Sequence, residues 1–389
     1  MRIRSLPLTL AAVVAVGVPA WHLTAAAQAP ALTFSATREL APGVTYRELD
    51  DPDYFGEGGP ISARFIEVRP GAATLDVAMG GDGTQGRAPV VHMAERRKAL
   101  AAINAGYFLP TGDPAGIYKI NGLLVSDTAR QRAAVAFGSP DGPPLLFDRV
   151  TVSARLRVNG VDVPVSGIDT AHGDNTVILF TPRFGDGVRG EGRLSEWALA
   201  DDPLHVVATA SREADSDAAP LQVPDGGYVL SAAGTPPAAL ANLHEGAEVS
   251  IEFDYDTEVG ADAEAWARAD DIIGGVGLLL RDGKPFTDWT IERITVSDFA
   301  TSRHPRTFIG RDREGDTWLV TIDGRQPAHS VGMTLLELID FAQRLGLTDA
   351  VNLDGGGSTT MVVEGALVNR PSDAVGLRAV SDGIVVLVK

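Results

Sequence analysis

The chain has 389 residues, enough for one large or two ordinary domains with a sizeable core. Hydrophobic residues make up 44% and charged residues 22%, which is typical of globular proteins and excludes a wholly disordered chain. A formal net charge of −18 argues against nucleic acid as a partner, because Lys and Arg hold phosphate backbones, and the lack of cysteine excludes disulfides, thiolate nucleophiles and Cys-type zinc sites.

The first segment, residues 1–29, is predicted to be a secretory signal peptide. Arg2 and Arg4 give it a basic start, residues 6–18 are apolar, and small residues precede a cleavage point near Ala27. We therefore expect a secreted or cell-envelope protein without stable membrane insertion after cleavage. The alternative is an uncleaved N-terminal anchor.

The N-terminal part, residues 30–149, reads mainly as strands with one helix. Apolar or alternating runs between Pro and Gly predict strands at 44–47, 62–69, 74–78, 101–103, 122–125 and 133–137. A helix is expected from Pro89 to about Leu100, because Pro is favoured in a first helical turn. The strand at 101–103 ends in the polar residue Asn104.

The middle part, residues 150–260, consists of short β-like runs between loops rich in Gly, Asp and Pro, and predicts an inserted β-rich module. The C-terminal part, residues 261–389, opens with an apolar run at 271–280. A helix is expected from Thr334, which forms a capping box with Glu337, to a stop at Gly346.

The 24 Pro and 43 Gly favour a turn-rich, β-containing chain over a helical bundle. We expect an α+β fold in which a mixed sheet with packed helices carries the functional site, beside the β-rich module. The N-terminal and C-terminal parts would together form the site-bearing domain.

Three predicted strands end in polar, glycine-bearing turns, where reacting groups are often placed. These turns are Asn104, Asp323-Gly324-Arg325 and Asp354-Gly355-Gly356-Gly357-Ser358. Three consecutive glycines allow close approach of a ligand, and their N–H groups can form an anion nest. Plain turn chemistry is the alternative for this segment.

Arginines gather between residues 303 and 325 of this acidic chain. Because the net charge repels anions, an anionic substrate needs local bidentate donors, and Arg supplies them for phosphate or carboxylate. We expect Arg306 and Arg325, which border strand ends, to serve this role. Arg311 and Arg313 are expected instead to pair with acidic neighbours on a surface turn.

The arrangement of these motifs resembles the phosphodiester glycosidase family. The resemblance covers most of residues 60–389. The motifs that carry it are Ala102-Ile103-Asn104-Ala105-Gly106-Tyr107-Phe108, His304-Pro305-Arg306-Thr307, Asp323-Gly324-Arg325, Ser330-Val331-Gly332-Met333-Thr334 and Asn352-Leu353-Asp354-Gly355-Gly356-Gly357-Ser358. The resemblance implies hydrolysis of a sugar-1-phosphodiester at the sugar C1–O bond. The substrate would be similar to an N-acetylglucosamine-1-phosphodiester or would be a phosphodiester of a cell-wall or capsule glycan.

Under this resemblance Asp354 is the expected catalytic carboxylate, and Asn104 and Asp323 are expected to bind sugar hydroxyls or position water. The phosphate clamp is assigned to Arg306, Arg325, Gly355, Gly356, Gly357 and Ser358. His329, Ser330 and Asn352 complete the expected substrate-binding set. His304 and His329 are also candidate general acids or bases.

Two other functions remain open from the sequence. The first is a metal-dependent phosphodiesterase that cleaves the P–O bond, with Asp323 and Asp354 holding calcium or magnesium. The second is a non-catalytic binder of wall polysaccharide. The leading hypothesis requires a phosphorylated glycan or sugar phosphodiester as substrate and no cofactor.

Overall fold

The computed structural model describes residues 31–83, 86–138, 145–184, 190, 192–213, 219–258, 263–294 and 298–388, excepting the side chains of 129 and 130. The predicted signal peptide lies outside the described residues. Among the helices of the described ranges, none is long and apolar enough to cross a membrane.

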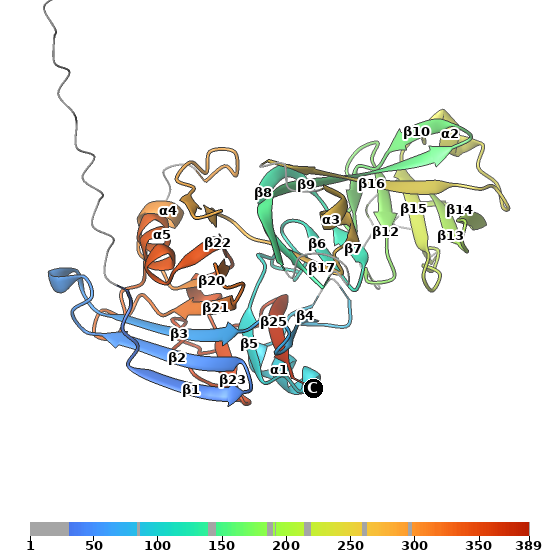
Figure 1. Ribbon diagram of the computed structural model, residues 1–389. Helices are drawn as coiled ribbons and strands as arrows, with labels where there is room; N and C mark the ends of the chain where they lie inside the picture. The colour runs from blue at the N-terminus through green and yellow to red at the C-terminus, as the bar shows by residue number, and fades with distance from the viewer. Residues whose placement is uncertain are drawn as a thin grey trace, which may run out of the picture. The chain divides into compact units, whose positions relative to one another are not determined.

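The largest sheet is built from both ends of the chain (Figure 1). Its order is β1 (Ala36–Ala41), β2 (Val44–Asp51), β3 (Ile61–Val68), β21 (Thr317–Ile322), β20 (Arg306–Asp312), β22 (Leu347–Asn352), β18 (Leu278–Arg281) and β19 (Lys284–Pro285). All neighbours pair antiparallel. The pairing of β21 with β3 joins the predicted N-terminal and C-terminal parts.

A smaller antiparallel sheet adjoins the site. Its order is β24 (Ala366–Leu367), β23 (Met361–Val363), β5 (Ala101–Asn104), β25 (Asp382–Leu387) and β4 (Thr74–Met79). Its residues share a core with the first sheet, including Ile103 and Ile384 against Ile309 and Val351. The predicted strands at 74–78 and 101–103 are confirmed as β4 and β5.

Two further sheets contain the middle of the chain. One has the order β10 (Val161–Pro164), β9 (Leu145–Val158), β8 (Thr128–Phe137), β17 (Asp271–Gly274), β6 (Tyr118–Ile120) and β7 (Leu123–Ser126), with β16 (Ser250–Thr257) also on β9. The other has the order β11 (Gly167–Ile168), β12 (Val177–Phe180), β15 (Tyr228–Ala233), β13 (Arg193–Ala200) and β14 (His205–Glu213).

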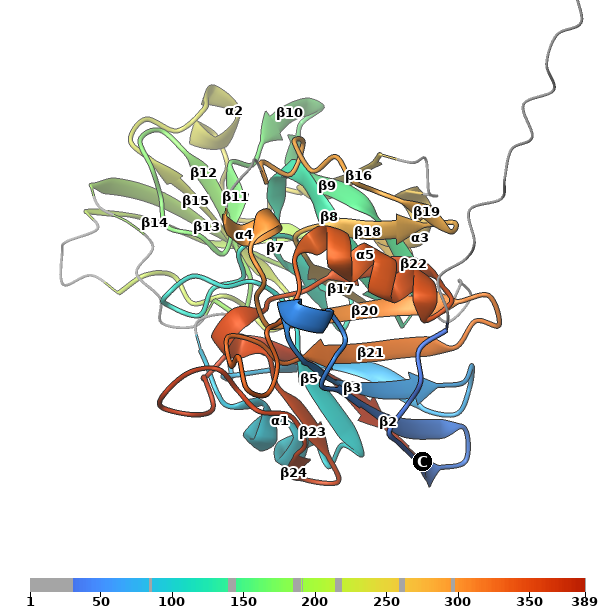
Figure 2. The same ribbon diagram turned by 90° about the vertical axis from the view of Figure 1, so that its left-hand side faces the viewer.

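Helices in the described ranges are few and short. They are α1 (Val90–Arg97), α2 (Ala238–Ala241), α3 (Ala263–Arg268), α4 (Asp298–Thr301) and α5 (Leu335–Arg344), with 3-10 turns η1 (Gly56–Gly58) and η2 (Gly356–Ser358). The predicted helices are confirmed as α1, after Pro89, and α5. Helix α5 lies against β18 and β22 (Figure 2).

The predicted α+β class is wrong, because the chain is mostly β-sheet. The two helices predicted from the sequence, α1 and α5, are present, but the helices are too few and too short to cover the sheets. Sheet faces instead share cores with other sheets, and strand pairs are antiparallel throughout the described elements except β11 with β12. The structure therefore has several antiparallel sheets, where a mixed sheet packed by helices was predicted.

Strand pairing crosses the predicted edge of the β-rich module at residue 150. Strand β9 begins at Leu145 and runs through residue 150 to Val158, pairing with β8 and β16 (Figure 1). The apolar run at 271–280 divides into β17 and β18, which belong to different sheets. The boundaries at 150 and 260 stay predictions.

The capping box of α5 gives a stability prediction. The Thr334 hydroxyl accepts a bond from the Glu337 N–H at 3.2 Å, and the Glu337 carboxylate accepts one from the Thr334 N–H at 2.9 Å. We expect Thr334→Ala to lower the free energy of unfolding by about 1 kcal/mol in urea titrations. Gln343→Ala on the exposed face of the same helix is the control, with an expected change below about 0.5 kcal/mol.

Candidate active site

Three strand ends meet around the buried amide of Asn104, the last residue of β5. Its Nδ2 donates to the Asp354 carbonyl at 2.6 Å. Its Oδ1 accepts from the Thr307 hydroxyl at 2.8 Å and from the Thr360 N–H at 3.0 Å. Asn104 therefore joins β5, β20 and the segment after β22, and fixes the backbone position of Asp354.

This role predicts that Asn104→Ala lowers the free energy of unfolding by about 3 kcal/mol, because it leaves buried polar partners without hydrogen bonds. The measurement is urea unfolding followed by tryptophan fluorescence. An unchanged midpoint would show that Asn104 does not hold these segments together.

A cavity of about 400 Å³ opens beside this junction. Its lining consists of Tyr107, Phe299, residues 304–306, Arg325, residues 354–357 and Arg378. Segments far apart in the sequence thus contribute to one opening, as the motifs predicted.

Arg306 presents a buried positive charge at the wall of this cavity, with only 1% of the residue exposed. Its Nε donates to the Met333 carbonyl at 2.8 Å and its Nη2 to the Phe299 carbonyl at 2.7 Å. Burial lowers the pKa of Arg306 to about 10, so the guanidinium stays charged at neutral pH. No ion pair with a carboxylate is formed by Arg306 within the described ranges.

Arg325 supplies a second cation to the same cavity, from the exposed loop after β21. Its Nη2 donates to Nδ1 of His304 at 3.2 Å, and Nε2 of His304 donates to the Asp298 carbonyl at 2.9 Å. Desolvation and the two nearby guanidinium groups lower the pKa of His304, which favours its neutral form. Arg325, like Arg306, has no carboxylate partner in the described part of the chain, so the cavity is electropositive.

Asp354 is the carboxyl group of the cavity, placed two residues after β22. Its Oδ1 accepts from the Gly355 N–H at 2.9 Å. Burial raises the pKa of Asp354 to about 6, while hydrogen bonds from Ser358 and Gly355 and the charge of Arg378 act in the opposite direction. This carboxyl group is therefore ionised at neutral pH and close to its titration range.

Gly355 and Gly356 meet a steric need, whereas a Cβ on Gly357 would meet only the ends of flexible side chains. A Cβ on Gly355 would lie 2.6 Å from the Pro305 carbonyl oxygen, Gly356 has φ +60°, and a Cβ on Gly357 would collide with the Asp373–Arg378 ion pair. The predicted three-amide anion nest does not form, because the Gly355 N–H bonds Asp354 and the Gly356 N–H bonds the Pro305 carbonyl at 2.9 Å.

Asp323 lies outside the lining of the cavity and organises the loop that carries Arg325. Both carboxylate oxygens are occupied: Oδ1 accepts from Asn369 at 2.9 Å, and Oδ2 accepts from the Arg370 N–H at 2.9 Å and from His329 Nε2 at 2.8 Å. The Asp323 carbonyl accepts from the buried Ser330 hydroxyl at 2.6 Å. His329 and Ser330 thus belong to this supporting cluster.

The other predicted site residues support the walls. Asn352 is buried, and its Nδ2 donates to the Tyr107 hydroxyl at 3.1 Å and to the Val276 carbonyl at 2.8 Å. Ser358 is buried and hydrogen-bonds Asp354. Arg311 pairs with Asp349 at 2.8 Å rather than with the acidic neighbours expected on its own turn.

Four lining residues were missing from the predicted site set, namely Tyr107, Phe299, Pro305 and Arg378. Tyr107, whose hydroxyl donates to the Leu353 carbonyl at 2.9 Å, follows the Asn104 motif and could have been found by its position. Arg378 pairs with Asp373 at 2.8 Å beside Gly357. Phe299 belongs to the short helix α4 and carried no sequence signal.

The fold does not place Asp323 and Asp354, the two metal ligands expected for the phosphodiesterase alternative, in the same cavity. Asp354 lines the cavity, whereas Asp323 is hydrogen-bonded in the supporting cluster. Across the described ranges no group of three or more His, Asp or Glu side chains is arranged to hold a metal ion.

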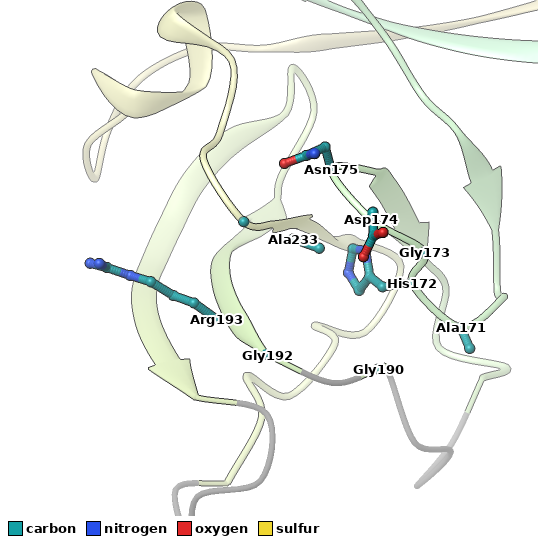
Figure 3. A pocket seen from close by; sticks show the side chains of 10 residues that line it. Ala171, His172, Gly173, Asp174, Asn175, Gly190, Gly192, Arg193 and Ala233 are labelled. Atoms are coloured by element: carbon teal, nitrogen blue, oxygen red, sulfur yellow. The ribbon is translucent and has the colours of Figure 1, made fainter.

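A larger cavity of about 590 Å³ lies in the β11–β15 sheet region, lined among others by His172, Asp174 and Arg193 (Figure 3). It contains none of the predicted site residues. The cavity at Asp354 is smaller, but it combines unpaired cations with a carboxyl group of raised pKa, which is typical of functional sites.

The family comparison agrees with the motif prediction. Residues 206–387 match the sequence profile of the phosphodiester glycosidase family. The predicted resemblance to this family is therefore confirmed over residues 206–387. The matched range begins inside the predicted β-rich module and does not include Asn104 or Tyr107.

Among curated proteins, the chain is similar to N-acetylglucosamine-1-phosphodiester alpha-N-acetylglucosaminidase. It is 36% identical to the mouse protein over 110 residues, covering 26% of this chain and 21% of that protein, with the same figures for the human protein. It is also 33% identical over 150 residues to the SPbeta prophage-derived uncharacterized protein YomE of Bacillus subtilis, covering 37% of this chain and 22% of YomE. The matches span about a fifth of these relatives.

Solved structures share the fold over most of this chain. A hypothetical protein from Synechocystis has a TM-score of 0.73 at 24% identity, covering 90% of this chain and 62% of that one. A Burkholderia pseudomallei protein described as exported has a TM-score of 0.67 at 24% identity, covering 84% and 74%. The zebrafish N-acetylglucosamine-1-phosphodiester alpha-N-acetylglucosaminidase catalytic domain, auto-inhibited by its pro-peptide, has a TM-score of 0.52 at 20% identity, covering 92% and 87%.

Proposed function

We propose that this protein hydrolyses a sugar-1-phosphodiester at the sugar C1–O bond, releasing a free sugar and a phosphomonoester. The proposal rests on one observation. Arg306 and Arg325, which have no carboxylate partner among the described residues, line the same cavity as the carboxyl group of Asp354. The cations suit an esterified phosphate, and the carboxylate suits the sugar carbon beside it.

The phosphate acts as leaving group. A phosphomonoester has a second pKa of about 6, so it departs as a stable anion and needs less protonation than an ordinary sugar alcohol. Arg306 and Arg325 would stabilise the negative charge that develops on it. Arg306 is held by backbone carbonyls before substrate arrives, so little reorganisation accompanies the reaction.

Asp354 would stabilise the oxocarbenium-like carbon or attack it, which requires the ionised form. Asn104 fixes the Asp354 backbone, and Asp323 fixes the loop that carries Arg325. In this proposal both are positioning residues, in place of the direct contacts with sugar or water expected from the sequence.

The substrate class follows from the same chemistry and from the names of the curated relatives, which specify an N-acetylglucosamine-1-phosphodiester. We propose a sugar of this kind, or a glycan of a bacterial wall or capsule linked through phosphate. Secretion through residues 1–29 is part of the proposal; the basic start and apolar run of that segment support it, as does the structural relative described as exported.

The direct test is incubation with the methyl phosphodiester of α-linked N-acetylglucosamine. The expected products are free N-acetylglucosamine and methyl phosphate, separated by chromatography. Release of methanol and N-acetylglucosamine-1-phosphate would contradict the proposed bond cleavage.

The raised pKa of Asp354 predicts the acid side of the pH profile. The carboxylate is the active form, so kcat/KM should fall about tenfold for each pH unit well below an apparent pKa of about 6. The measurement is kcat/KM between pH 4 and pH 8 with the same substrate. A profile that stays flat down to about pH 4.5 would contradict an ionised Asp354 as the reacting group.

A further inference from the structure

The cavity at Asp354 adjoins a second cavity whose lining does not include Arg306 or Arg325. This second cavity, of about 410 Å³, shares Tyr107, Asp354 and Arg378 with the first and adds Arg87 and Phe108. A third, of about 310 Å³, shares Leu109 with the second. The three cavities therefore follow one another, with Asp354 between the first and the second.

The second cavity has the size and chemistry for the sugar that is cleaved. Arg87 is exposed, lines this cavity and forms no hydrogen bond or ion pair with any described residue. Phe108 and Leu109 add an apolar wall, and Leu109 is 50% exposed. Sugar rings bind to this combination of apolar faces and polar donors.

The third cavity lies where β7 contacts β11, between the site-bearing sheets and the middle of the chain. Ser126, Asp127 and Thr128 line it from the junction of β7 and β8, and Ser166 and Thr170 line it from either side of β11. Hydroxyl and carboxyl groups dominate, and Arg132 already donates to the Ala115 carbonyl at 2.7 Å. This lining disfavours a second phosphate and suits neutral sugar hydroxyls.

Asp127 contributes a carboxyl group to the wall of this cavity. It is partly buried and makes no ion pair in the portion of the chain described, and desolvation raises its pKa to about 6. Desolvation of a partly buried carboxylate costs free energy, which a hydrogen bond from a ligand hydroxyl would offset.

We propose that the substrate is a glycan chain whose terminal phosphodiester lies in the Arg306–Arg325 cavity, whose first sugar lies between Asp354 and Arg87, and whose following sugars cross Leu109 to hydrogen-bond Asp127. This inference rests on the proposed function and deepens it. It makes the protein a glycan-processing enzyme with at least one sugar subsite beyond the cleaved residue.

The test compares two substrates. One is the methyl phosphodiester of N-acetylglucosamine, and the other carries two more sugars on the side away from the phosphate. The wild-type protein should show at least a tenfold higher kcat/KM for the longer substrate. Asp127→Asn should raise KM for the longer substrate about tenfold and leave both constants unchanged for the shorter one.

Asp174→Asn is the matched control, because Asp174 lines the separate cavity of Figure 3. It should leave both substrates unaffected. Equal kcat/KM values for the two substrates, or an Asp127→Asn variant like the wild type, would overturn the subsite while leaving the proposed function intact.

A third substrate, lengthened on the phosphate side instead, tests the direction of binding. If this substrate alone gains activity and Asp127→Asn removes the gain, the assigned direction is overturned. Hydrolysis of none of the three would overturn the proposed function and the subsite together.

Discussion

Replacing Asp354 with Asn is expected to reduce kcat at least about a thousandfold while the protein folds normally. The substitution keeps the size of the side chain and removes the charge that, in the proposed function, acts on the sugar carbon. The Asn104 bond to residue 354 goes to its backbone carbonyl and is retained. The measurement is single-turnover hydrolysis of the N-acetylglucosamine phosphodiester.

The same variant should be as stable as the wild type or more stable. The folded-state pKa of Asp354 is about 6, above its ordinary value of 3.8, so ionisation at neutral pH costs folding free energy. Asn removes that cost, and we expect a gain of about 1 kcal/mol in urea unfolding at pH 7.5, decreasing toward pH 4. Normal turnover in this variant would remove Asp354 from the mechanism.

Replacing Arg325 with Ala is expected to lower kcat/KM by about a hundredfold, through loss of one of the two cations that meet the phosphate. The free energy of unfolding should be nearly unchanged, because the Arg325 side chain is exposed. Arg and Ala both have a Cβ, so the backbone strain at φ +59° is the same in the variant. Arg325→Lys should recover only part of the loss, since Lys keeps the charge but lacks the planar pair of donors.

Arg313→Ala is the matched control for loss of a positive charge. Arg313 is exposed on the turn between β20 and β21 and does not line the cavity. Its kcat/KM should stay within about twofold of the wild-type value. An equal loss in both variants would indicate long-range attraction of the substrate rather than a local clamp.

Sequence patterns predicted which strands end in polar residues, because strand ends carry strong local signals. Asn104 ends β5, Asp323 follows β21 and Asp354 follows β22 by two residues. Pairing of β21 and β22 with β20 places the ends of these two strands at one edge of a sheet, whereas Asn104 comes from a second sheet and joins them through hydrogen bonds of its side chain. Helix α5 could likewise be predicted from its capping residues Thr334 and Glu337 and from Gly346 after its C-terminus.

The exact use of each polar group could not be predicted, because it depends on tertiary hydrogen bonds. Asn104 and Asp323 have the residue types of substrate ligands, yet the folded protein engages their side chains internally. The amides of Gly355 and Gly356 are likewise occupied, so the glycines serve close packing under Arg325 and Arg378 more than anion binding.

The prediction of the fold class was wrong for a related reason. Strong helix signals identify individual helices, whereas the class depends on what covers each sheet face. The apolar run at 271–280 shows the limit: its two halves pair with β8 and β22 in different sheets, and periodicity within the run gives no sign of the division.

Hydrolysis of the N-acetylglucosamine methyl phosphodiester in oxygen-18 water tests most directly which bond the cavity at Asp354 breaks. Mass spectrometry of both products locates the solvent oxygen. Cleavage of the sugar C1–O bond predicts one heavy oxygen in the released sugar and none in methyl phosphate. Heavy oxygen in the phosphate product would contradict the account, since water would then have attacked phosphorus.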